Sequence, residues 1–180
     1  MHIRPLTQAD LDMILSWRNA PAVRQNMYTS HEISPEEHRA WFARVEGDNT
    51  KRYFVFERDG VGRGVIGFTA IDTNNKRSSW AFYASPDAPR GTGSAMEYLA
   101  LEYAFNELAL LRLHCEVLDF NRAVIQLHQS FGFTIEGTLR EHHYNGERYC
   151  DVVLLGILND EWQQRRAAIR QKLRLDEVAS

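Results

Sequence analysis

Residues 80–95 read WAFYASPDAPRGTGSA, a short aromatic run followed by a glycine-rich turn that opens a long helical pattern. Glycine lets the main chain approach a ligand closely, and the first turn of a helix presents free N–H groups at the positive end of its dipole. Such a turn is suited to a pyrophosphate. We therefore predict that a diphosphate binds at Arg90, Gly91, Thr92, Gly93, Ser94 and Ala95. A glycine-rich turn without a ligand is the alternative interpretation.

The surroundings of this turn disfavour two common phosphate-binding folds. The turn lacks the Lys-Ser or Lys-Thr ending of a Walker loop, and it follows a meander of three predicted antiparallel strands. A dinucleotide-binding turn would instead follow the first strand of a parallel sheet. ATP and NAD are thus poor candidates, and the diphosphate of an acyl carrier remains.

The chain before the turn predicts two helices and then an antiparallel meander. After a short strand at residues 1–6, a capping box at residues 7–10 opens a helix that runs through Trp17. A second box at residues 34–37, with a proline at the first helical position, opens another helix. The predicted strands of the meander are residues 52–57, 64–71 and 79–84.

The chain after the turn changes to alternating helices and strands. A helix at about residues 94–108 precedes a strand at 113–118, and this order predicts a strand parallel to the one before the turn. A helix at residues 122–130 and a hairpin that turns at Asn145-Gly146 complete the pattern. We expect a mixed α/β (α+β) fold with one domain at residues 1–158 and a helical tail at 159–180.

Composition points to a small-molecule partner. The 180 residues are 44% hydrophobic with a net charge of -3, so we expect neither nucleic acid nor a membrane as partner. The N-terminus lacks the layout of a signal peptide, and no apolar run reaches the roughly 18 residues of a membrane span, which predicts a cytoplasmic protein. Cys115 and Cys150 lack the spacing of metal ligands, so we expect buried thiols and no metal.

Two segments resemble the GNAT acetyltransferases. Arg90, Gly93 and Ala95 match the family's pyrophosphate loop Gln/Arg-x-x-Gly-x-Gly/Ala, and residues 121–133 resemble a later segment that begins at an asparagine and ends in Gly-Phe. The resemblance implies acetyl-CoA as co-substrate and a GNAT-like mixed central sheet of about seven strands flanked by helices, with two splayed parallel strands. It places the pantetheine arm of the coenzyme along Ala81, Phe82 and Tyr83 and near Asn121.

A finer resemblance concerns the acceptor. Scattered residues from about 12 to 157 resemble the family members that acetylate the 4-amino group of a UDP-linked amino-deoxysugar in pseudaminic acid biosynthesis. This implies an N-acetyltransferase in which the amine attacks the thioester directly. The alternatives are a protein N-terminal (ribosomal-protein type) acetyltransferase, a polyamine acetyltransferase and a non-catalytic coenzyme A-binding module. A homodimer is also left open.

Acetyl transfer to an amine requires a base for the amine proton and a proton for the departing thiolate. In the strand at 113–118, alternation places His114 and Glu116 on one face. We expect Glu116 to act as general base, directly or through a water, with a structural Glu-Arg ion pair as the alternative. His114 either orients Glu116, serves as base itself or is structural.

His128 stands where many members of the family have a tyrosine that protonates the coenzyme thiolate. A histidine can supply this proton near neutral pH. Otherwise His128 is a residue on the helix surface, and the thiolate leaves with the help of solvent. The sequence leaves these two interpretations open.

Residues of the N-terminal helices are expected to recognise the acceptor. Arg18 can hold a diphosphate through its guanidinium group. An apolar, partly aromatic wall for a deoxysugar methyl group or a nucleobase is expected from Met27, Tyr28, His38 and Trp41. Core packing is the alternative for Met27 and Trp41.

Overall fold

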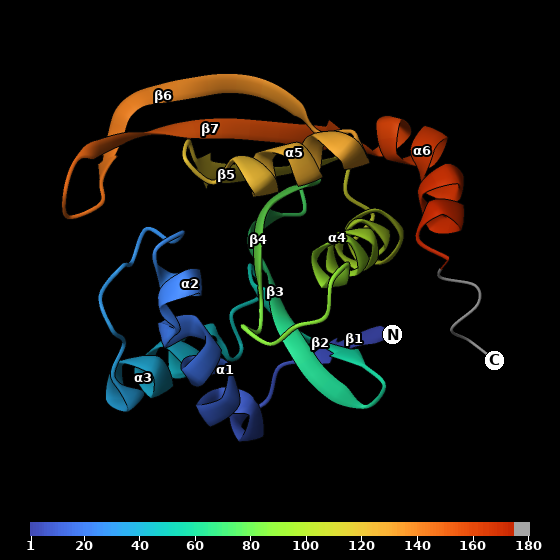
Figure 1. Ribbon diagram of the computed structural model, residues 1–180. Coiled ribbons are helices and arrows are strands. Elements are labelled where there is room, and N and C mark those ends of the chain that lie inside the picture. The colour runs from blue at the N-terminus through green and yellow to red at the C-terminus, as the bar shows by residue number, and fades with distance from the viewer. Residues whose placement is uncertain (175–180) are drawn as a thin grey trace.

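The computed structural model describes residues 1–174, which form one sheet with helices on both of its faces (Figure 1). The elements in chain order are β1 (His2–Pro5), η1 (Gln8–Asp10), α1 (Leu11–Asn19), α2 (Pro21–Arg24), α3 (Pro35–Val45), β2 (Arg52–Arg58), β3 (Val61–Asp72), β4 (Arg77–Ala84), α4 (Thr92–Glu102), η2 (Tyr103–Glu107), β5 (Arg112–Leu118), α5 (Arg122–Phe131), β6 (Thr134–Tyr144), β7 (Tyr149–Leu158) and α6 (Asn159–Lys172). None of the helices in this range has the length and apolar character that crossing a bilayer requires.

The strands form a seven-stranded sheet in the order β1-β2-β3-β4-β5-β7-β6. The central pair, β4 and β5, is parallel, whereas all the other neighbouring strands, from β1 to β4 and from β5 to β6, are antiparallel. The connection between these two strands passes through α4, which returns the chain to the edge from which it left. The mixed α/β fold with one parallel pair, predicted from the sequence, is confirmed.

The strands β4 and β5 separate soon after they begin. Their pairing ends at Ser79 and His114. β4 nevertheless continues beside β3 as far as Ala84, and β5 continues beside β7 as far as Leu118. Beyond the last pair, each strand is therefore held only by its outer neighbour. Main-chain N–H and C=O groups on the two inner edges are left to bind whatever enters between the strands.

The helices cover the two faces of the sheet in separate groups. α4 packs on one face together with α5 and α6, and α1 and α3 pack on the other (Figure 1). The alternation of side chains along β3 serves both layers, because Ile66 joins the cluster under α4 whereas Val65 joins the cluster under α1 and α3. The open end of the β4–β5 pair lies between these layers.

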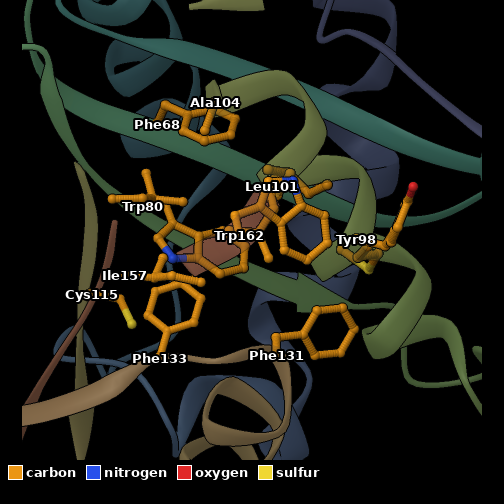
Figure 2. Close-up of a cluster of buried hydrophobic side chains, with 14 of the residues drawn as sticks. Phe68, Trp80, Tyr98, Leu101, Ala104, Cys115, Phe131, Phe133, Ile157 and Trp162 are labelled. Atoms are coloured by element: carbon orange, nitrogen blue, oxygen red, sulfur yellow. The ribbon is translucent and has the colours of Figure 1, made fainter. Parts of the chain in front are cut away.

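Trp162 anchors α6 in the larger hydrophobic cluster. Its indole is fully buried among aromatic rings of α4 and α5, with the ring centroids of Tyr98 and Phe131 at 5.5 and 6.5 Å (Figure 2). The indole N–H donates to Glu102 Oε1 at 3.0 Å. Of the tail expected at 159–180, residues 175–180 lie outside the described residues. The division of the chain at residue 158 stays a prediction.

The helix predicted at about residues 94–108 differs from the observed one at both ends. It begins at Thr92, because Gly91 adopts a left-handed conformation with φ of 89° and the Thr92 hydroxyl donates to the carbonyl of Pro89 at 2.7 Å. Its last turn is π-helical, and the Leu108 N–H reaches back five residues to the carbonyl of Tyr103 at 3.0 Å. A widened turn of this kind interrupts the 3.6-residue period on which the prediction relied.

A charged network fixes the start of the N-terminal helices. The Arg4 guanidinium donates to both carboxylate oxygens of Asp10, at 2.7 and 2.8 Å, and its Nε donates to Glu57 at 2.6 Å. The Thr7 main-chain N–H also donates to Asp10, at 2.9 Å, which closes the predicted capping box. Asp10 is buried, so these donors replace the water that its carboxylate has lost.

This network makes part of the stability sensitive to acid. The hydrogen bonds from Arg4 are the main cause that lowers the pKa of Asp10 from 3.8 to about 2. Because the folded pKa lies below the unfolded one, the stabilisation is complete above about pH 5 and is lost as the pH falls through both pKa values, from about 5 to 1. We expect Asp10→Asn to lower the free energy of unfolding by about 1 kcal/mol at pH 7 and by only a small part of that at pH 2. Urea unfolding at both pH values measures this, with Asp12→Asn on the exposed first turn of α1 as control.

Candidate active site between the splayed strands

A cavity of about 430 Å³ lies where β4 and β5 part. Its walls come from the inner edges of both strands, from α5 and from the start of α4, and α2 with the following loop closes one side. The lining residues are Ala22, Val23, Asn26, Met27, Trp80, Ala81, Phe82, Tyr83, Ala84, Ser85, Pro86, Gly93, Cys115, Glu116, Val117, Asn121, Ala123, Val124, Leu127 and His128. The surface is mainly apolar, which suits a long thioester arm.

The glycine-rich turn lies at the α4 end of this cavity. The N–H groups of Gly93 and Ser94 donate no hydrogen bond within residues 1–174, as expected for the first turn of a helix. A Cβ at Gly93 would lie 3.4 Å from Leu127 Cδ2 and 3.7 Å from Phe82, so the main chain here is close to both walls. These features fit a diphosphate bound to the helix start with its arm running between the strands.

The ten residues predicted to bind the coenzyme are placed in two ways. Half of them line the cavity, namely Ala81, Phe82, Tyr83, Gly93 and Asn121. The others form the turn and the helix start beside it and are absent from the lining: Arg90 and Gly91 are exposed, Ser94 is half-buried, and Thr92 and Ala95 are buried.

Glu116 meets Tyr28 at one side of the cavity. The Tyr28 hydroxyl donates to Glu116 Oε2 at 2.6 Å, although the two residues are 88 positions apart. The Tyr28 ring also packs edge-on against His143 of β6, with centroids 5.0 Å apart. Desolvation and the Glu116 carboxylate raise the pKa of Tyr28, so this phenol stays a hydrogen-bond donor. The carboxylate is therefore paired with a phenol and not with the arginine that sequence reasoning offered as the alternative.

His128 lies inside the cavity wall and not on the helix surface. Its side chain is 3% exposed, and its Nδ1 lies 2.9 Å from Oε1 of Glu97. The rings of Trp80, Phe82 and Phe133 surround it, with centroids 5.4, 5.9 and 5.0 Å away.

Glu97 was missed by the sequence analysis. It is fully buried on α4, and burial is the main cause that raises its pKa. The sequence held one signal: Glu97 is the only charged residue in the segment 95–98, whose other residues are apolar or aromatic and are buried in the structure. A carboxylate in such a position requires a partner, and the partner is 31 residues away.

His114, the third predicted catalytic residue, is placed differently. It is half-buried and pairs with Ser79 of β4 and Gly156 of β7, at the point where the strands are still joined. It is absent from the cavity lining, and desolvation is the main cause that lowers its pKa. The structure brings Glu116 and His128 to the cavity and leaves His114 at its closed end.

The predicted acceptor residues separate into two groups. Met27 lines the first cavity and Tyr28 contacts Glu116. The other three line a second cavity of about 350 Å³, whose walls are Arg18, Thr29, Ile33, Glu37, His38, Trp41, Arg44, Tyr53, Val65 and Tyr83. Tyr83 lines both cavities and is the wall between them.

The polar groups of the second cavity are arranged around Arg18. The Arg18 Nη2 group donates to the carbonyl of Thr29 at 2.9 Å, whereas Nη1 is buried without a partner. His38 stacks on Trp41 with ring centroids 5.2 Å apart. Desolvation, followed by the charge of Arg18, lowers the pKa of His38, which keeps its imidazole neutral.

Parted parallel strands, a free helix start after a glycine turn and an apolar cleft between them define a site for an acyl-coenzyme A. The sequence matches the family described as acetyltransferase (GNAT) domain over residues 1–134. The chain belongs to the GNAT acetyltransferase family. It is an N-acetyltransferase, and its co-substrate is acetyl-CoA.

Particular relatives narrow the comparison. Acetyltransferase PseH of Campylobacter jejuni is 33% identical over 130 residues, which cover 72% of this chain and 80% of that enzyme. Spermidine N(1)-acetyltransferase of Escherichia coli K12 is 24% identical over 89% of this chain and 87% of that enzyme. In fold, the chain resembles spermidine N-acetyltransferase from Vibrio cholerae, crystallised with CoA and spermine, with a TM-score of 0.84, 24% identity and coverage of 89% and 96%.

The close approach at Gly93 provides a test of the coenzyme site. We expect Gly93→Val to weaken CoA binding at least about tenfold, because a branched side chain would cover the free N–H groups and narrow the cleft against Leu127. Gly93→Ala is the matched control, since a Cβ alone makes only ordinary contacts, and its affinity should stay within about threefold. Titration calorimetry with CoA measures both. If the valine variant and the native chain bound CoA with equal affinity, the prediction that the diphosphate binds at this turn would be wrong.

Proposed function

We propose that the chain transfers the acetyl group of acetyl-CoA to the 4-amino group of a UDP-linked amino-deoxysugar. The sequence resembles the branch of the family that acts on such sugars in pseudaminic acid biosynthesis, and two relatives named PseH are 33% and 32% identical to it. The main support for the proposal is the second cavity, which has an excess of positive charge and contains the unpaired hydrogen-bond donor Arg18 Nη1.

That cavity is built to receive an anion. It contains two guanidinium groups, Arg18 and Arg44, against one carboxylate, Glu37. A buried N–H group without an acceptor is costly, and Arg18 Nη1 is such a group. A diphosphate satisfies it with a strong, charge-assisted hydrogen bond. The rings of Trp41 and Tyr53, which also line this cavity, offer apolar contact to a uracil ring.

The two cavities suit the two ends of one nucleotide sugar. Tyr83 separates them, so a ligand whose diphosphate lies near Arg18 can extend its sugar past this ring toward Glu116. Met27 supplies an apolar contact for the methyl group of a deoxysugar on the same side of the first cavity. The position of the amine is then set by the nucleotide, at a distance from the reacting atoms.

Three groups of this chain serve the transfer. Glu116 takes the proton from the amine, directly or through a water, and the main-chain N–H of Phe82 binds the carbonyl oxygen as its negative charge develops. His128 gives a proton to the sulfur that leaves. When bound, acetyl-CoA supplies the acetyl group as a reactive thioester. The apolar walls of the cavity exclude water and so protect this thioester from hydrolysis.

Polyamine and protein N-terminal acceptors are less well matched. A polycation requires several carboxylates, yet Glu116 is the single carboxylate among the described residues that line the first cavity, and Glu37 faces two arginines in the second. The likeness to spermidine acetyltransferases, at 24% identity, concerns the fold. Peptide N-termini likewise favour an open groove with acidic walls.

A panel of acceptors tests the proposal. The release of free CoA thiol is measured with UDP-4-amino-4,6-dideoxysugars, spermidine and peptides with free N-termini. We expect kcat/KM for the sugar to exceed that for the other acceptors by at least about 100-fold, because only the sugar nucleotide fills both cavities. Comparable or higher values with spermidine or a peptide would refute a sugar nucleotide as the acceptor.

The role of Arg18 makes a second, sharper test. We expect Arg18→Met to raise KM for the UDP-sugar by about 10- to 100-fold and to leave KM for acetyl-CoA within about twofold, because the lost contact is to the acceptor's diphosphate. Arg39→Met is the control, since Arg39 is an exposed arginine of α3 that is absent from the second cavity. An unchanged KM for the sugar would place its diphosphate elsewhere.

A further inference from the structure

Glu97 is a buried carboxylate beside the reacting end of the site. It is fully buried on α4, and its single hydrogen bond within residues 1–174 is to His128 Nδ1, while its second oxygen, Oε2, has no partner. A neutral side chain of similar size would avoid the cost of burying this group. We therefore expect the Glu97 carboxylate to have a role other than packing.

The same contact decides which nitrogen of His128 faces the cavity. Nδ1 is bonded to Glu97, so Nε2 is the ring nitrogen left to a ligand, and it donates no hydrogen bond within the described residues. The aromatic rings of β4 and Phe133 enclose the imidazole on its other sides. These rings and the Glu97 contact restrict rotation of the imidazole. Since His128 lines the cleft between the strands, Nε2 is the nitrogen that the ring presents to the cleft.

We propose that Glu97 is a positioning residue, which holds Nδ1–H of His128 and so presents Nε2–H to the departing thiolate sulfur. The inference rests on the acetyl transfer and on the proton-donating role of His128 proposed above, and not on the identity of the amine. To donate from Nε2 while Nδ1–H is held by Glu97, the ring must carry a proton on both nitrogens before the transfer.

The proton balance of the transfer is complete with these groups. As the bond between carbon and the amine nitrogen forms, the bond between carbon and sulfur breaks, and its electron pair stays on sulfur. The amine nitrogen loses one proton on the side of Glu116, and sulfur gains one proton from Nε2 of His128. The imidazole that remains keeps Nδ1–H bonded to Glu97 and is protonated again from solvent.

The titratable neighbours of His128 are few. Glu97 faces it from α4, and Cys115 of β5 lies in the same cavity wall, where burial and then the charge of Glu97 raise the pKa of its thiol. The residues packed against it from β4 are the neutral rings Trp80 and Phe82. Among the described residues, Glu97 is thus the one ionisable side chain in hydrogen-bond contact with the imidazole.

Glu97→Gln separates positioning from packing, because glutamine keeps the size and a hydrogen-bonding oxygen but removes the charge. We expect kcat to fall about 10- to 100-fold, with CoA affinity within about twofold. Glu102→Gln is the matched control: it removes another α4 carboxylate, one that bonds Trp162 and Arg166 away from the cleft, and it should leave kcat unchanged.

His128→Asn completes a double-mutant cycle, since the asparagine amide can still donate to Glu97 but carries no transferable proton. In this background Glu97→Gln should lower kcat by less than about twofold. Any accepted amine serves for these rates. If Glu97→Gln lowered kcat equally with and without His128, Glu97 would act on the fold and the inference would be wrong.

Nitrogen-15 spectra of the imidazoles give a readout that needs no acceptor. In the protein with CoA, His128, assigned by its loss in His128→Asn, should carry a proton on Nδ1, and Glu97→Gln should mix the two tautomers. An unchanged tautomer together with an unchanged kcat would overturn the inference. A native chain that shows Nδ1–H but acetylates no sugar would count against the proposed acceptor alone.

Discussion

The central constraint is that β4 and β5 stop pairing after Ser79 and His114 while each keeps its outer neighbour. A strand can leave one partner without fraying only if the other holds it, and β3 and β7 provide this support. The separated edges then keep their hydrogen-bonding groups in a rigid frame. The glycine turn, α4 and α5 are built on this frame, so the free helix start, the apolar cleft and His128 all take their positions from one divergence of strands.

This arrangement places two ionisable side chains in an apolar interior. His128 and Glu97 lie beside Trp80, Phe82 and Phe133, where each would be costly alone and where the pair is tolerated because the two meet at 2.9 Å. Low polarity strengthens the interaction between them and fixes the ring. Trp80 and Phe133 belong to the same hydrophobic cluster as the fully buried Trp162 (Figure 2). Close packing in such a cluster resists a rearrangement that would relieve the pair.

Sequence reasoning predicted what local patterns encode. The meander, the crossover helix, the glycine turn and the capping box at residues 7–10 depend on neighbours within a few residues, and the family resemblance supplied the splayed strands. At residues 34–37 only the Ser34 cap forms, because the Glu37 side chain contacts His31 instead. Sequence reasoning could not predict contacts between distant segments, such as Tyr28 with Glu116 or Glu97 with His128, because no periodicity links positions 88 or 31 residues apart. For the same reason it could not tell that Arg18 and Met27, nine residues apart in sequence, line different cavities that share Tyr83.

The bond between Tyr28 and Glu116 has a consequence for the order of events. A group that binds Oε2 of Glu116 must displace the phenol, whereas an arm that enters between β4 and β5 from the α4 end does not cross this bond. The segment that carries Tyr28 joins α2 to α3 and is held by the Asn19 side chain, which bonds the main chain of Ile33 at 2.8 and 2.9 Å. The cleft can therefore receive a coenzyme from the α4 end while the contact between this N-terminal segment and β5 is still closed.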